Sequence, residues 1–165
     1  MARVPKPSHF DESGSARMVD VGSKPETART ATAGGVVILS RDAFRALADG
    51  TAKKGDVLAV ARVAGIQAGK RTSEWIPLCH PVPLTSLDVE FALDEKASRV
   101  EVTATARCVA RTGVEMEALT AVSAAALTVY DMLKAVDRGI RIEGIRLLHK
   151  AGGKSGEYTE KSRAS

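Results

Sequence analysis

A short segment between two prolines is the first part of the chain whose residue types and spacing favour chemistry. In the sequence IPLCHP, residues 76–81, the prolines enclose Leu78, Cys79 and His80. Proline fixes its own φ angle and restricts the residue before it, so we expect the side chain of His80 to point in one defined direction. Its imidazole could hydrogen-bond a base or phosphate, or transfer protons near neutral pH; the alternative is a hydrogen-bonded histidine in a rigid loop. Adjacent Cys and His cannot both bind one metal comfortably and no second pair exists, so no metal site is predicted.

Two carboxylates stand at the predicted start of a long helix. Glu115 and Glu117 flank Met116, just after Gly113. The helix dipole favours negative charge at an N-terminus, and this explains the acidic residues without any function. The functional interpretation is recognition of a guanine-like edge, because its N–H donors need carboxylate acceptors. The residues alone leave both interpretations open.

An acidic and a basic residue lie near the end of the same predicted helix. Asp131 and Lys134 are three positions apart, so they share one face of the helix. An ion pair at the surface is the simpler interpretation. The preceding helical segment is almost wholly small or apolar, so the pair could instead lie at the edge of a cleft. Partial burial there could tune the lysine into a proton donor or acceptor.

Two groups of lysines are placed where phosphates are commonly held. Lys150 and Lys154 lie among the glycines of the sequence HKAGGKSG, residues 149–156. The spacing is not that of a Walker A motif, and a disordered basic tail is the alternative. Lys54 comes just before a predicted helix start at Asp56, and a helix N-terminus readily holds phosphate.

Composition and charge limit the class of protein. The 165 residues, 44% of them hydrophobic, suit one globular domain, for which we expect residues 18–156 with flexible tails at 1–17 and 157–165. The net charge of +4 is mild and favours a small polyanion over nucleic acid as the partner. No run reaches the length of a membrane span, and Cys79 and Cys108 form no redox or metal pair. We therefore expect a cytoplasmic protein.

Hydrophobic periodicity predicts an α+β fold. Leaving out a short helix at 41–48, the elements follow the order β-α-β-β-α-β, typical of a ferredoxin-like antiparallel sheet with its helices on one face. Two strands alternate apolar and polar residues around a hairpin loop at 94–98. The full set of expected elements is a strand at 28–40, a helix from 57 to between 70 and 75, strands at 86–93 and 100–108, a helix at 114–137 and a strand starting at 140 and continuing through 147.

Several of these segments together resemble one family, the molybdenum-cofactor biosynthesis protein C family. The resemblance spans residues 18 to 156 in the expected order. Members of that family convert 3′,8-cyclo-7,8-dihydroguanosine 5′-triphosphate to cyclic pyranopterin monophosphate and pyrophosphate. The resemblance also implies a ferredoxin-like fold and a homohexamer, built as a trimer of dimers, with active sites at subunit interfaces. The matching segments are MVDV (18–21), KGDV (54–57), AGIQ (64–67), IPLCHP (76–81), GVEMEALTA (113–121), YDM (130–132), KAV (134–136) and GGKSG (152–156).

The resemblance assigns roles to particular residues. Asp131, Lys134 and Lys54 match catalytic or active-site positions, while Leu133 stands where many members have cysteine. Substrate-binding positions fall on Leu78, Cys79, His80, Glu115, Met116, Glu117 and Lys150, and we expect Lys154 to hold phosphate with Lys54 and Lys150. No cofactor is implied as a requirement, although Mg²⁺ bound through the substrate's phosphates remains compatible with the sequence.

Two other classes of function compete with this interpretation. RNA-recognition domains share the β-α-β-β-α-β order, but they stack bases on strand aromatics, and the predicted strands contain only Phe91, on the apolar alternating face. A non-catalytic regulator that binds a nucleotide is the stronger alternative, because lysines and carboxylates can simply bind.

Glu117 and Asp131 are too far apart on one helix for one nucleotide to contact both. We therefore expect each site to be built from two subunits.

Overall fold

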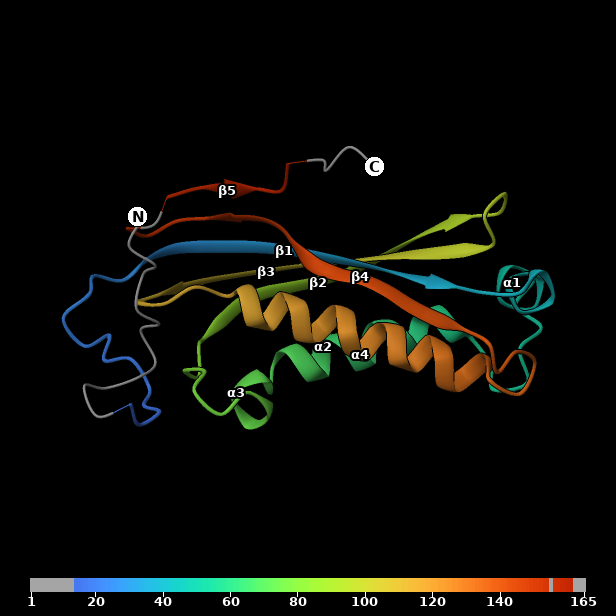
Figure 1. Ribbon diagram of the computed structural model, residues 1–165, viewed down its shortest axis with the longest axis horizontal. Helices are drawn as coiled ribbons and strands as arrows, with labels where there is room; N and C mark the ends of the chain where they lie inside the picture. The colour runs from blue at the N-terminus through green and yellow to red at the C-terminus, as the bar shows by residue number, and fades with distance from the viewer. Residues whose placement is uncertain (1–13, 155, 162–165) are drawn as a thin grey trace.

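The computed structural model describes residues 14–154 and 156–161 as an open antiparallel sheet with helices on one face (Figure 1). The sheet order is β2-β3-β1-β4-β5, and all neighbouring strands are antiparallel. This arrangement confirms the predicted ferredoxin-like α+β fold. The elements are β1 (Thr27–Ile38), α1 (Arg41–Ala48), α2 (Val57–Gly69), α3 (Thr72–Trp75), β2 (Leu84–Asp94), β3 (Arg99–Ala110), α4 (Glu115–Leu133), β4 (Arg141–Ala151) and β5 (Tyr158–Thr159).

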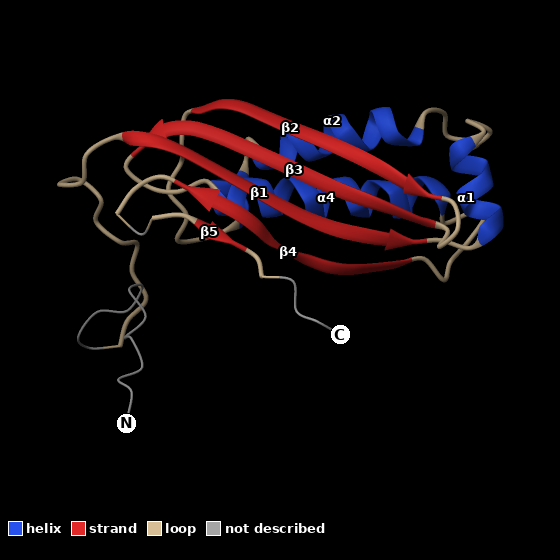
Figure 2. Cartoon of the chain, turned by 90° about the horizontal axis from the view of Figure 1, so that it is seen from above, coloured by secondary structure: helices blue, strands red, loops and turns tan. Residues whose placement is uncertain are grey.

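Helices α2 and α4 lie side by side beneath the sheet, as both views show (Figures 1 and 2). Small residues let the two helices approach closely. A Cβ atom added at Gly65 of α2 would lie 2.9 Å from the carbonyl oxygen of Ala121 and 3.3 Å from the Cβ atom of Ala125, both on α4. The core is accordingly aliphatic and alanine-rich, as expected from the low aromatic content.

Helix α4 is the central element of the core. Val122, Val129 and Leu133 are fully buried under β1 and β3. The helix is long and apolar enough to cross a membrane by length and composition alone. Most of that segment is buried inside the domain, and a buried core helix of a globular domain can be equally long and apolar.

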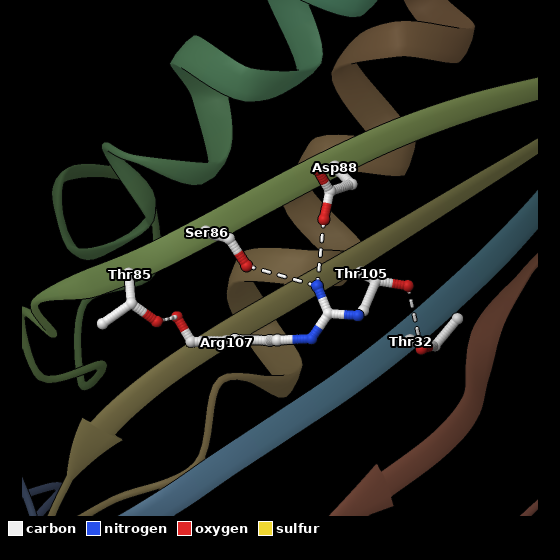
Figure 3. A network of polar contacts seen from close by, with 6 residues as sticks. All are labelled: Thr32, Thr85, Ser86, Asp88, Thr105 and Arg107. Carbon is white, nitrogen blue, oxygen red and sulfur yellow. Dashed lines mark hydrogen bonds and ion pairs between the residues drawn. The ribbon is translucent and has the colours of Figure 1, made fainter.

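The sheet face away from the helices is polar (Figure 3). The Arg107 guanidinium on β3 donates to Asp88 Oδ2 at 3.0 Å and to Ser86 Oγ at 3.2 Å, both on β2. Phe91 lies on the opposite face, where the Arg62 guanidinium of α2 sits 5.7 Å from its ring centroid. The aromatic side chain that an RNA-recognition surface would need is therefore packed under a helix, which argues against that alternative.

Most predicted elements match the structure, with differences at their ends. The long helix ends at Leu133 rather than near Asp137: Lys134 is its C-cap, and the chain then forms a turn in which the N–H groups of Val136 and Asp137 both bond to the Leu133 carbonyl. The helix predicted to run from 57 to as far as 75 is two helices, α2 and α3. Strand β5 was not predicted: it pairs with β4 inside the segment expected to be a flexible tail at 157–165. Residues 1–13 of the expected N-terminal tail, Ser155 and residues 162–165 lie outside the described residues.

Candidate active site

Three predicted residues meet at the C-terminal end of α4. The Lys54 Nζ atom lies 2.7 Å from Asp131 Oδ2, and the Lys134 Nζ atom lies 2.7 Å from Asp131 Oδ1. Lys54 also donates to the backbone carbonyl of Asp131 at 2.9 Å, where a helix end attracts cations. We call these residues the Lys54–Asp131–Lys134 cluster. It joins the loop before α2 to the end of α4, a contact that sequence spacing alone did not predict.

The two lysines set the protonation state of the cluster. Hydrogen bonds from Lys134 and then Lys54 lower the pKa of Asp131 to about 2, so this carboxylate stays ionised at any ordinary pH. The hydrogen bond and negative charge of Asp131 raise the pKa of Lys134. The hypothesis that burial lowers the pKa of this lysine is therefore not supported in the single chain, where the side chain is 52% exposed. Lys134 is held as a protonated ammonium group beside a carboxylate, a state that can donate a proton.

A large cavity lies at the other end of α4. Its volume is about 900 Å³, and it lies between the start of β1, the end of β3 and the loop after β4. Glu115 and Lys150 form an ion pair on its wall, with 2.8 Å between the Lys150 Nζ and Glu115 Oε1 atoms. Lys154 also lines the cavity. The predicted phosphate-holding lysines of this loop therefore border a space of the size of a nucleotide site.

Three further cations of the cavity were missed in the sequence. Lys24, Arg29 and Arg111 line the same space. Lys24 lies in a segment with little periodicity, and the two arginines stand in or just after strands where a polar residue is expected anyway. In the sequence, the one sign of this cavity was Arg29, a single charged residue among the Thr and Ala residues of β1. Five cationic side chains around one cavity make it suited to a polyanion.

The glycines of the loop after β4 are required by its close packing. Gly152 and Gly153 have φ angles of +99° and +76°, in the left-handed region. A Cβ atom would collide with the Ala28 carbonyl oxygen at the first position and with the Arg29 guanidinium at the second. Arg29 in turn donates from Nη1 to the Gly152 carbonyl at 3.3 Å. The glycine pair thus places this guanidinium at the cavity wall.

The proline-bracketed loop packs against the first turn of α4. The Cys79 thiol donates to Glu117 Oε1 at 3.8 Å, and Glu117 is only 2% exposed. The residues next to these two in the chain, Leu78, His80 and Met116, are half-buried. None of the three lines the 900 Å³ cavity. Burial is the main reason that the pKa of Glu117 is raised and that the pKa of Cys79 is raised to about 11. This thiol is therefore a poor nucleophile at neutral pH.

The predicted site residues thus form two groups at opposite ends of one helix. Glu117 and Asp131 are separated by fourteen helical positions, or about 21 Å along the axis. The structure brings Lys54 to Asp131 and Lys150 to Glu115, but it does not bring the two groups together in one chain. Within residues 14–154 and 156–161, no three His, Cys, Asp or Glu side chains are grouped to hold a metal ion.

The fold and these two polar regions define a ferredoxin-like α+β domain suited to binding a small polyanion. Residues 18–153 match the MoaC family, and the chain belongs to that family. A relative from Heliobacterium modesticaldum is 59% identical over 92% of this chain and 95% of its own length. Relatives from Thermomicrobium roseum and Parvibaculum lavamentivorans are 60% and 56% identical, over 92% and 94% of this chain and 91% and 98% of their own lengths. Each of the three is named cyclic pyranopterin monophosphate synthase.

Proposed function

We propose that this chain is a cyclic pyranopterin monophosphate synthase, a phosphorus–oxygen lyase of molybdenum cofactor biosynthesis. It converts 3′,8-cyclo-7,8-dihydroguanosine 5′-triphosphate to cyclic pyranopterin monophosphate and releases pyrophosphate. The observation that carries the proposal is the set of relatives with this name, which are 56–60% identical to the chain over at least 92% of its length. The matched region spans both ends of α4, where the two groups of site residues lie.

The cavity of five cations supports the binding half of this reaction. A triphosphate carries several negative charges, and Lys24, Arg29, Arg111, Lys150 and Lys154 surround one space. We assign these residues to the phosphates, because guanidinium and ammonium groups stabilise phosphate oxygens through charge-assisted hydrogen bonds. The same cations would stabilise the charge of the departing pyrophosphate. We further propose that no cofactor is needed, with any Mg²⁺ entering on the substrate's phosphates.

The Lys54–Asp131–Lys134 cluster supports the proton-transfer half. Rebuilding a purine as a pterin requires repeated proton transfers, and Lys134 is a protonated group held in one position by Asp131. Asp131, ionised and bonded to two lysines, keeps both ammonium groups fixed. We assign proton donation to Lys134 and positioning of the lysines to Asp131.

We also propose that each site combines the two ends of α4 from different subunits of a homohexamer, a trimer of dimers. The support is the distance of about 21 Å between the groups, which one nucleotide base and its sugar do not span. A two-fold axis beside α4 would place the Lys54–Asp131–Lys134 cluster of one subunit near the cavity of its partner and create two equal sites. We also propose that the enzyme is cytoplasmic.

The proposal is tested by incubating the purified protein with the cyclic triphosphate and following both products. We expect one pyrophosphate for each cyclic pyranopterin monophosphate. Removing divalent cations with a chelator should not abolish formation of the two products. Tight binding of the nucleotide without pyrophosphate release would instead identify a non-catalytic nucleotide-binding regulator and overturn the proposal.

A further inference from the structure

Glu117 is an acidic side chain whose surroundings do not suit a charge. It lies in the first turn of α4 and is 2% exposed. Its Oε1 atom accepts a hydrogen bond from the Cys79 thiol, and its Oε2 atom is buried with no hydrogen-bond partner among the described residues. Glu117 takes part in none of the ion pairs of the described residues. The carboxyl group therefore has one occupied oxygen and one unused one.

Among the described residues, no cation pairs with this carboxyl group: Arg29, beside Cys108 in the sheet, donates to the carbonyl oxygens of Ala110 and Gly152 instead. Cys79 faces it from the proline-bracketed loop, Cys108 lies near it on β3, and Glu115 lies near it on α4. The carboxylate of Glu115 is already engaged with Lys150. Burial is the largest cause of the raised pKa of Glu117, and the charge of Glu115 acts in the same direction. Its own backbone N–H and the Cys79 thiol act in the opposite direction but do not offset the burial.

The charged and the neutral form of a buried carboxyl group need different surroundings. A carboxylate removed from water needs a cation or several good donors to replace its hydration, and its own backbone N–H with a weak thiol donor at 3.8 Å is a poor replacement. A neutral carboxylic acid fits the same contacts better. Its carbonyl oxygen accepts from Cys79, while its hydroxyl group is left as a donor.

We propose that Glu117 works as a neutral carboxylic acid, which holds the Cys79 loop through Oε1 and offers the hydroxyl group at Oε2 as a hydrogen-bond donor to the bound ligand. The acceptor would be a carbonyl oxygen or a ring-nitrogen lone pair of the ligand's base. This differs from recognition of guanine N–H donors by a carboxylate, which needs the ionised form. Only the identity of the ligand rests on the proposed function.

The decisive experiment is infrared spectroscopy of the full-length protein at pH 7. We expect the C=O stretching band of a protonated carboxyl group, above the amide band, in the wild-type protein. Glu117→Gln should remove this band, and the matched control Glu115→Gln should leave it unchanged, because Glu115 is held in an ion pair with Lys150. Titrating the wild-type protein to higher pH should remove the band without any substitution. Absence of a Glu117-dependent band at pH 7 would overturn the proposal, whether or not the protein is an enzyme.

Turnover of the cyclic triphosphate provides the second readout. Glutamine reproduces the neutral acid, since its amide oxygen can accept from Cys79 and its NH₂ group can donate. We therefore expect Glu117→Gln to keep kcat/KM within about tenfold of the wild type, whereas Glu117→Ala loses about 100-fold or more. A glutamine variant as inactive as the alanine variant, with normal thermal unfolding, would show that the negative charge is required and would contradict the proposal.

Discussion

Reassembling two differently damaged subunits tests whether each active site combines two chains. Glu117→Ala damages the start of α4 and Asp131→Asn damages its end, and each variant alone should be inactive. The two positions lie about 21 Å apart along the helix, so we expect them to serve different sites within one chain. In a pair formed from the two variants, one site then receives both defects and the other receives neither. Activity should return on mixing.

The expected recovery follows from the symmetry of the pair. Random reassembly of equal amounts of two variants makes about half of the pairs mixed, and one of the two sites in each mixed pair is intact. About a quarter of the wild-type activity per site should therefore return. The assay is pyrophosphate release after the parents are dissociated, mixed and reassembled, with mixed pairs counted by native mass spectrometry.

A second mixture provides the matched control. Asp131→Asn and Lys134→Ala lie at the same end of α4, so neither site of their mixed pair is intact and no activity should return. If the mixture of Glu117→Ala and Asp131→Asn stays as inactive as its parents, with mixed pairs present, both residues serve one site within one chain and the two-subunit model is wrong.

Three further predictions concern the cluster, the cavity and its glycines. Lys134→Ala should lower turnover by about 100-fold or more with the fold intact, and should raise the pKa of Asp131 above about 2 by removing its strongest hydrogen bond, as measured by carboxyl NMR titration. Lys150→Ala should weaken binding of the triphosphate about 10- to 100-fold, and binding of a monophosphate analogue less, as measured by calorimetry. Gly152→Ala should destabilise the protein more than Gly50→Ala in chemical unfolding. Both residues have positive φ angles, costing about 1–2 kcal/mol, but only Gly152 packs against backbone.

Each of these predictions has a result that contradicts it. An unchanged Asp131 pKa in Lys134→Ala would show that Lys54 or solvent sets the charge of the cluster. Equal losses for the two phosphate ligands would argue against a triphosphate clamp at Lys150. Equal losses of stability for Gly152→Ala and Gly50→Ala would mean that the loop after β4 can move away from β1.

The sign of the pH dependence follows from the lowered pKa of Asp131. A carboxyl group with a depressed folded-state pKa contributes stability above its unfolded value, near 3.8, and this contribution is lost as the pH falls through about 2. The cluster should therefore keep its charges throughout the neutral range. Any loss of activity between pH 4 and 6 has to come from other groups.

The sequence predicted the type and order of the elements because their patterns are local. The alternation along β3 can be read over a few residues, and so can the starts of α1 and α2, which the structure shows capped by the side chains of Ser40 and Asp56. Element ends were predicted less closely: α4 ends at Leu133, before the predicted end near Asp137, although the helical pattern of the sequence continues. Strand β5 has only two residues and forms because β4 offers an unpaired edge, which its own sequence does not signal.

The sequence by itself determined the fold class, the family and the chemical types of the site residues, because these depend on residue identity and short-range periodicity. Only the tertiary structure decided which of those residues meet. Lys54 reaches Asp131 across 77 positions, and Lys24, Arg29 and Arg111 surround one cavity with the loop after β4. It also decided that Glu117 is buried without a cation while Asp131 is exposed between two. Such contacts and burial depend on how the sheet and helices pack. Two carboxylates with the same chemistry in the sequence therefore acquire opposite pKa shifts in the folded protein.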